Sequence, residues 1–130
     1  MAMQDLKYHE LTEKIIGAAM KVHRYFGPGF AEIVYLRALV IEFEKISLPY
    51  TQEVEKDIFY DGTSIYKKRV DLIVDNTVLL ELKASRENDN GEQAPIIINY
   101  LRVFNMEVGL LLNFGAPSLQ FKRFTNTIIN

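Results

Sequence analysis

The sequence predicts one α/β or α+β domain in which helices flank a mixed central β-sheet. Three observations predict it. The periodic segments follow the order helix, helix, three strands, helix, two strands, or ααβββαββ. A β–α–β step runs from Leu79 to Asn113, which calls for two parallel strands joined by a crossover helix. The length of 130 residues is that of a single domain, so we assign residues 1–130 to one unit.

The two N-terminal helices are predicted from apolar residues at helical spacing. The first covers about residues 6–26, carries one apolar stripe and ends at Gly27-Pro28-Gly29. The second covers about residues 31–46 and has apolar residues on more than one face, so we expect it to be packed on two sides. Leu48-Pro49 then breaks the helical pattern.

Three strands follow as consecutive hairpins. The first, about residues 51–60, alternates and ends at Asp61-Gly62, which is a strong hairpin signal. The next two, about residues 64–74 and 78–83, are strongly apolar and flank the turn residues Asp75-Asn76.

One helix and two strands complete the pattern. The helix, about residues 92–105, tolerates Pro95 because a first-turn N–H group lacks a helical partner anyway. Residues 108–114 are almost wholly apolar, which predicts a central, covered strand, and residues 119–124 form the last strand.

Composition excludes several classes of protein. With no cysteine, disulfides and thiolate zinc sites are ruled out, and the isolated His9 and His23 predict solvent exposure rather than zinc binding. No signal-peptide pattern or membrane-length apolar run is visible, so we expect a cytoplasmic protein that does not enter the membrane. The net charge of -2 requires any phosphate binding to be local.

Three charged residues interrupt the second and third strands: Asp71, Glu81 and Lys83. Charged side chains are rarely buried unless they are paired or bind a metal. Because strand side chains alternate between faces, the register decides whether these three meet. A three-residue loop, 75–77, puts Asp71 opposite Glu81, whereas a two-residue turn sends the carboxylates to opposite faces. In the first register, the other face is an apolar row made of Val70, Leu72 and Val74 with Val78, Leu80 and Leu82.

Two carboxylates on one face repel each other unless a cation lies between them. Mg²⁺ prefers such oxygen ligands, and a bound metal acidifies water for attack on phosphorus. Lys83 points to the same face and could pair with a phosphate oxygen or orient that water. A simple cross-strand ion pair, worth about 0.2–1 kcal/mol, explains the spacing equally well.

Other polar side chains could surround this pair. Glu32 begins the second helix, and Tyr35 follows one turn later on the same face. Gln93 and Tyr100 of the third helix could reach a site at the strand ends. Each has a structural alternative, since a first-turn Glu is stabilised by the helix dipole and the tyrosines could simply pack.

The segment Gly29-Phe-Ala-Glu32-Ile-Val-Tyr35 resembles the signature of the GxxExxY proteins, a family in the PD-(D/E)XK nuclease superfamily. The resemblance continues in order through Val70-Asp71-Leu72, Leu80-Glu81-Leu82-Lys83, Gln93 with Asn99-Tyr100-Leu101-Arg102, Gly109 to Gly115, and Lys122-Arg123-Phe124. It implies a restriction-endonuclease-like core. It also implies that Asp71 and Glu81 are metal ligands, that Glu32 assists the metal, that Lys83 is catalytic, and that Gln93 and Tyr100 lie near the site.

These observations favour a hydrolase that uses Mg²⁺ or Mn²⁺ to cut nucleic acid, with DNA favoured over RNA. The basic cluster Lys67, Lys68 and Arg69 could contact phosphates without reading sequence. The alternative is a catalytically silent PD-(D/E)XK-like module with a protein-interaction or structural role, for which a homodimer is open. A small-molecule phosphate enzyme on the same scaffold is a third reading.

Overall fold

The computed structural model describes residues 3–87 and 91–126. The elements are α1 (Met3–Phe26), α2 (Glu32–Lys45), β1 (Tyr50–Tyr60), β2 (Thr63–Val74), β3 (Val78–Lys83), α3 (Gln93–Phe104), β4 (Val108–Asn113) and β5 (Gln120–Thr125). The predicted order ααβββαββ is confirmed, and each boundary lies within a few residues of its expected place. No helix of the described chain is long and apolar enough to cross a membrane.

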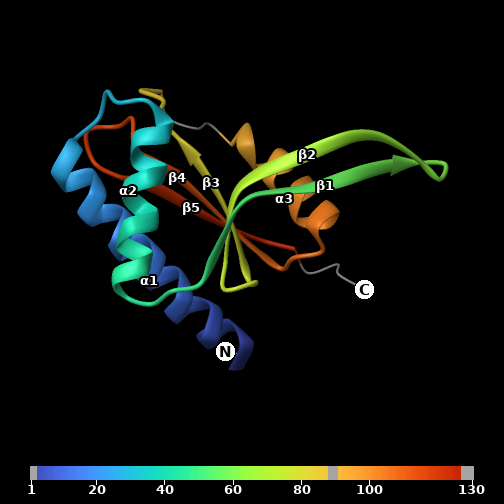
Figure 1. Ribbon diagram of the computed structural model, residues 1–130, viewed down its shortest axis with the longest axis horizontal. Coiled ribbons are helices and arrows are strands. Elements are labelled where there is room, and N and C mark those ends of the chain that lie inside the picture. The colour runs from blue at the N-terminus through green and yellow to red at the C-terminus, as the bar shows by residue number, and fades with distance from the viewer. Residues whose placement is uncertain (1–2, 88–90, 127–130) are drawn as a thin grey trace.

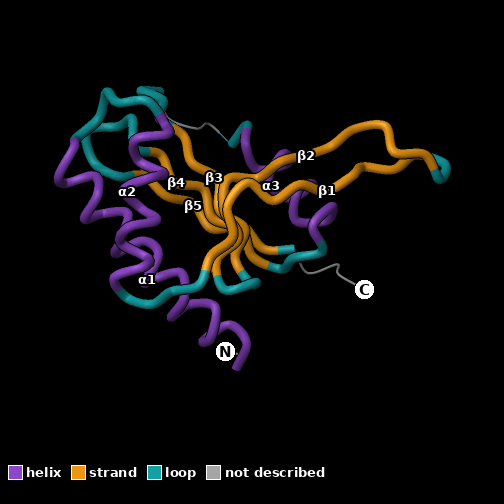
Figure 2. Tube along the Cα trace, viewed as in Figure 1, coloured by secondary structure: helices purple, strands orange, loops and turns teal. Residues whose placement is uncertain are grey.

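The five strands form one mixed sheet in the order β1-β2-β3-β4-β5. Only β3 and β4 run parallel, joined through α3, and the other neighbours are antiparallel. Helices α1 and α2 cover one face of the sheet and α3 covers the other (Figures 1 and 2). This is the helix-flanked mixed sheet of a restriction-endonuclease-like core, as predicted.

Alternation along β3 and β4 divides the core in two. Leu80 and Leu112 point toward α1 and α2, where they join residues such as Phe43. Leu79 and Leu111 point the other way, toward α3. Every residue of β4 is buried, which confirms the central position predicted for this strand.

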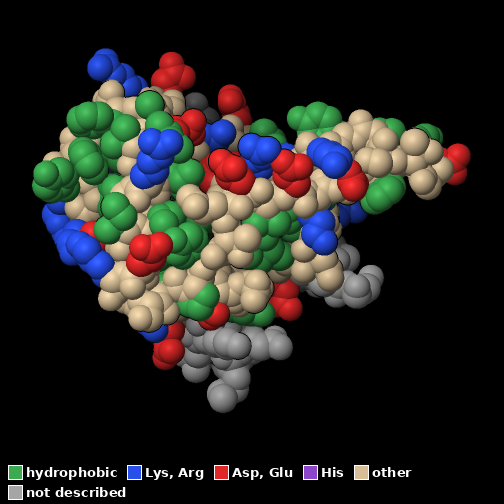
Figure 3. Space-filling view, viewed as in Figure 1, with side chains coloured by type: hydrophobic (Ala, Val, Ile, Leu, Met, Phe, Trp, Pro, Cys, Tyr) green, Lys and Arg blue, Asp and Glu red, His purple; other side chains and the backbone are tan. Residues whose placement is uncertain are grey.

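Helix α2 packs against two neighbours, α1 and β3, as the apolar residues on more than one of its faces predicted. Its buried residues are Tyr35, Leu36, Leu39 and Phe43. Ile33 and Ile41 are 44% and 54% exposed. The positions of α2 that face neither α1 nor the sheet lie on the outside of the molecule (Figure 1). Hydrophobic side chains gather accordingly over this end of the surface (Figure 3).

His23 is buried, contrary to the exposure expected from sequence, whereas His9 is exposed beside Glu13. The Nε2 atom of His23 lies 2.9 Å from the carbonyl oxygen of Ala116. The ring therefore fastens the end of α1 to the loop between β4 and β5. A sequence with one isolated histidine gives no sign of such a backbone partner.

The β1–β2 hairpin extends well beyond the rest of the sheet (Figure 1). Its strands have 11 and 12 residues, against 6 in each of β3, β4 and β5. Asp61 and Gly62 both have positive φ, 51° and 77°, as a two-residue hairpin turn that matches strand twist requires.

Candidate active site

The register of β2 and β3 places Asp71 across from Glu81. Leu72 pairs with Leu80 and Val74 pairs with Val78, which leaves residues 75–77 as the connecting loop. The three-residue loop predicted from the apolar rows is therefore confirmed. The loop is closed by the N–H of Thr77, which donates to the carbonyl oxygen of Val74 at 3.0 Å.

The strands separate at Asp71. On one side, the β1 ladder passes from the Gln52–Leu72 pair to the Val54–Val70 pair, and Glu53 between them has a φ of 51°. On the other side, the β2–β3 pairs extend no further than Leu72 and Leu80. Asp71 therefore forms no regular backbone pair with either neighbouring strand, β1 or β3.

Side-chain hydrogen bonds replace the backbone ladder there. The N–H of Asp71 donates to Oε1 of Glu81 at 3.2 Å. The N–H of Leu82 donates to Oδ2 of Asp71 at 2.8 Å. Each carboxylate is therefore held by the backbone of the opposite strand, and the two acidic groups are brought together as the register predicted.

The break also turns Val70 away from its expected face. Leu72 and Val74 belong to the core under α1 and α2, but Val70 packs with Leu79 in the core under α3. The predicted row of Val70, Leu72 and Val74 on one face is wrong for Val70. The change of face coincides with the irregular Glu53 opposite Asp71, which strict alternation does not anticipate.

Glu81 is the electrostatically strained member of the pair. It is only 8% exposed, and burial, with a smaller contribution from the charge of Asp71, raises its pKa to about 7. The hydrogen bond from the Asp71 backbone and the charges of Lys68 and Lys83 act in the opposite direction. Burial, more than repulsion from Asp71, therefore disfavours the ionised form of Glu81.

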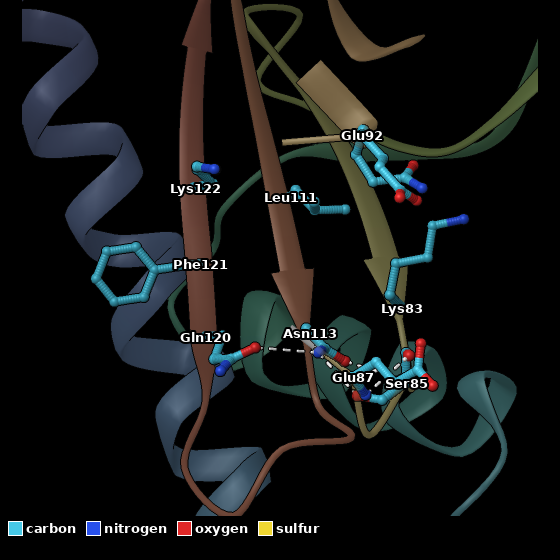
Figure 4. A pocket seen from close by; sticks show the side chains of 10 residues that line it. Lys83, Ser85, Glu87, Glu92, Leu111, Asn113, Gln120, Phe121 and Lys122 are labelled. Carbon is cyan, nitrogen blue, oxygen red and sulfur yellow. Dashed lines mark hydrogen bonds between the residues drawn. The ribbon is translucent and has the colours of Figure 1, made fainter. Parts of the chain in front are cut away.

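Lys83 ends β3, two residues after Glu81, and lines a cavity of about 540 Å³ whose lining includes neither Asp71 nor Glu81. Ser85, Gln93, Asn113 and Lys122 also line this cavity. Figure 4 shows the Lys83 side chain directed along the cavity toward Glu92. The cavity lining carries charges of both signs, Lys83 and Lys122 with Glu87 and Glu92.

Asn113 fixes the floor of the cavity. Its Oδ1 accepts from the N–H groups of Ser85 and Gly115, both at 3.0 Å. Its Nδ2 donates to the Ser85 carbonyl oxygen at 2.9 Å and to Gln120 Oε1 at 3.2 Å (Figure 4). A side chain at Gly115 is excluded, because a Cβ atom there would lie 2.4 Å from the Ser85 nitrogen. Sequence reasoning gave these residues no role, although Asn113 and Gly115 lie in one of the quoted motifs.

The two α3 residues named from the sequence lie at different places around the site. Gln93 lines the Lys83 cavity directly. Tyr100 contacts Lys68, whose Nζ lies 4.1 Å from the centre of the ring. Lys68 is a further residue that the sequence reasoning did not place at the site, since a basic run at a strand end is usually solvated.

Glu32 is not brought to the pair. It is exposed at the start of α2, and among residues 3–87 and 91–126 no three acidic or histidine side chains form a group that could hold a metal. Tyr35 is buried core instead, stacked on Phe114 at 4.6 Å. Its hydroxyl donates to the Gly27 carbonyl oxygen at 2.6 Å and accepts from the Phe30 N–H at 3.2 Å. It therefore fixes the loop that leads into α2.

Comparison with known proteins identifies the family of the chain. Residues 9–124 match the family described as the PD-(D/E)XK nuclease superfamily, and the chain belongs to that superfamily. No curated protein matches the chain.

Among solved structures, the chain is similar to one titled "Crystal structure of SSO0001", with a TM-score of 0.57 and 21% identity over 72% of this chain. This chain spans about half of that one, 48% of its length. At this identity the likeness shows the fold.

Proposed function

We propose that this protein is a metal-dependent nuclease that hydrolyses phosphodiester bonds of nucleic acid, with DNA favoured over RNA. The observation that carries the proposal is the Asp71–Glu81 pair. Two carboxylates are held together at a strand divergence, and one of them is buried enough to raise its pKa to about 7. Such a pair is stabilised by a cation, and its oxygen ligands suit Mg²⁺ or Mn²⁺.

Asp71 and Glu81 would hold the metal, which, when bound, acidifies a water molecule and offsets charge on the phosphate. Lys83, beside the open cavity, would hold a phosphate oxygen or orient the attacking water. Gln93 would orient the same end of the substrate, and Tyr100 would position Lys68. We assign Glu32 an assisting role through water, because the fold leaves it outside the pair.

Cleavage assays on single-stranded and duplex DNA and RNA, with Mg²⁺ and Mn²⁺, test the proposal. We expect the wild type to cut, and Asp71→Asn and Lys83→Ala to lose at least a hundredfold in rate. Asp75→Asn is the matched control for the first change, because Asp75 is exposed in the adjoining loop. Lys67→Ala, also exposed, is the control for the second. A wild type that binds Mn²⁺ but cuts none of these substrates would contradict the proposal.

A catalytically silent interaction module is the second candidate. The exposed Ile33 and Ile41 of α2 favour it, because large apolar side chains on an outer helix are typical of contact surfaces. A homodimer and a cytoplasmic location belong to these proposals as well, and the lack of cysteine fits a reducing compartment. Calorimetric titration separates the two functions: a silent module with a lost site takes up no Mn²⁺, and Asp71→Asn changes nothing.

A further inference from the structure

The projecting part of the β1–β2 hairpin, residues 55–69, has two unlike faces; we call it the arm. One face is that of Lys68, which lies against Tyr100 of α3. Cross-strand neighbours share a face, so Lys56, which pairs with Lys68, and the pair Ile58–Tyr66 lie on it too. We call this the α3-side face.

The α3-side face carries unbalanced positive charge. Lys56 and Lys68 are directly opposite each other, an arrangement in which like charges repel. Neither forms an ion pair with any residue in the described part of the chain. Two opposed ammonium groups, neither held in an ion pair, form a site suited to a phosphate anion.

The opposite face of the arm shows that this imbalance is local. Arg69 binds Glu55 at 2.6 Å, and Lys67 pairs across the hairpin with Asp57. Acidic and basic side chains alternate along the arm in Figure 3. The arm is therefore close to neutral on that face and cationic on the α3-side face.

The α3-side face leads directly to the candidate active site. Lys68 precedes Asp71 on the same strand, and its charge acts on the Glu81 carboxylate. Lys83 lies beyond the pair, at the cavity. The cations Lys56, Lys68 and Lys83 thus mark a path that passes the two carboxylates.

Exposed aromatic rings accompany this path. Tyr66, on the α3-side face, is 63% exposed, and Phe59 and Tyr60 at the tip are 64% and 74% exposed. An aromatic ring on a groove wall stacks with bases that are free of a partner strand, and such stacking does not depend on sequence. Phosphate-binding lysines with interleaved aromatics therefore favour an unpaired strand over a duplex.

We infer that the α3-side face of the arm binds a single-stranded segment of nucleic acid, with Lys56 and Lys68 on its phosphates and Tyr66 stacked on a base. The inference deepens the proposed function by naming the substrate class, and it rests on that function only for cleavage, since the arm can bind without metal. Single-stranded DNA and single-stranded RNA both present the phosphates and unpaired bases that these residues would contact.

Fluorescence anisotropy in EDTA tests the inference, with labelled oligo(dT), oligo(U) and a blunt DNA duplex as probes. We expect one or both single strands to bind at least fivefold more tightly than the duplex. Lys56→Ala should weaken single-strand binding about threefold to tenfold at low salt and lower the salt dependence by about one counterion. Tyr66→Ser should weaken single-strand binding about fivefold or more. Lys56→Arg, which keeps the positive charge, should bind single strands as tightly as the wild type.

The arm supplies matched controls. Lys67→Ala removes the same charge from the other face, and Ile65→Ser removes an equally exposed side chain, 63%, that lacks a π-system. Thermal melting checks that all variants fold. If each control loses as much affinity as its partner variant, or if the duplex binds as tightly as both single strands, the inference is overturned.

The outcomes separate this inference from the nuclease proposal. In EDTA, Asp71→Asn should bind single strands at least as tightly as the wild type, because it leaves the arm intact and removes one negative charge from the path. If the protein binds single strands through Lys56 and Tyr66 but never cuts them, the binding role of the arm is supported and the nuclease proposal is contradicted. If Lys56→Ala and Tyr66→Ser each cut as well as the wild type, the nuclease proposal is supported and the binding role of the arm is contradicted.

Discussion

Asp71 and Glu81 each use the backbone of the other's strand. The N–H of Asp71 donates to the Glu81 carboxylate, and the N–H that follows Glu81, that of Leu82, donates to the Asp71 carboxylate. Both acidic groups are therefore placed by backbone atoms rather than by flexible side-chain contacts. A metal site built in this way has its ligands ordered before the ion arrives, which reduces the entropic cost of binding.

The raised pKa of Glu81 makes stability depend on pH. Its folded pKa is about 7 against an ordinary value of 4.5, so its contribution to stability is full below pH 4.5 and is lost as pH rises through 7. That difference corresponds to about 3 kcal/mol. In urea unfolding without metal, Glu81→Gln should therefore gain stability relative to wild type as pH rises from 5 to 8. A difference that stays constant over this range would contradict the assigned ionisation.

Metal binding should also depend on pH, because the same Glu81 carboxyl must lose its proton before it can bind the ion. A ligand must lose its proton to bind, so Mg²⁺ or Mn²⁺ should bind more tightly at pH 8 than at pH 6, with affinity falling up to about tenfold per pH unit below 7. Calorimetry in two buffers of different ionisation enthalpy measures the released proton. Asp71→Asn should abolish binding, and Asp75→Asn should retain it. Equal affinities at both pH values would show that no metal ligand takes up a proton between pH 8 and pH 6.

The sequence predicts the pairing of Asp71 with Glu81 if the apolar rows of the two strands share a face, which requires the three-residue loop rather than the two-residue turn. It does not predict the turn of Val70 onto the other face, which coincides with the left-handed backbone of Glu53 in the neighbouring strand. The contact of Lys68 with Tyr100 is missed for a similar reason. It joins strand to helix across the fold, and a basic run carries no sign of which lysine will turn inward.

Gly115 allows the cavity floor to close. A Cβ atom would lie 2.4 Å from the Ser85 nitrogen, 2.5 Å from the Ala84 carbonyl carbon and 2.5 Å from the Ser85 oxygen, none of which can move independently of the backbone. Gly115→Ala should therefore destabilise the protein by about 2 kcal/mol or more in urea unfolding.

Gly17→Ala is the opposite case and serves as the control. Gly17 lies within α1, and a Cβ atom added there would meet no atom of a neighbouring element within 4 Å. Because alanine favours a helix interior over glycine, this change should stabilise by about 0.5–1 kcal/mol. Equal effects of the two substitutions would show that the close approach at Gly115 does not constrain the fold.

The Tyr35 hydroxyl should contribute to stability rather than to catalysis directly. Tyr35→Phe removes a bond to the Gly27 carbonyl and leaves the Phe30 N–H without that acceptor, which should cost about 1–2 kcal/mol in urea unfolding. Tyr25→Phe, at a residue that is 83% exposed, should change stability by less than about 0.5 kcal/mol. A stability unchanged by Tyr35→Phe, with activity lost, would instead assign the hydroxyl to the reaction.

Lys68 should tune the metal site without binding the metal. Its positive charge lowers the pKa of Glu81, so Lys68→Met should raise that pKa above about 7. The pH at which half of the maximal Mn²⁺ affinity is reached should then move upward, while affinity at high pH changes little, because the carboxylates themselves remain. Lys67→Met, which faces away from α3, should leave the midpoint where it is. A uniform loss of affinity at every pH, with no displacement of the midpoint, would mean that Lys68 supports the site by packing on Tyr100 rather than by its charge.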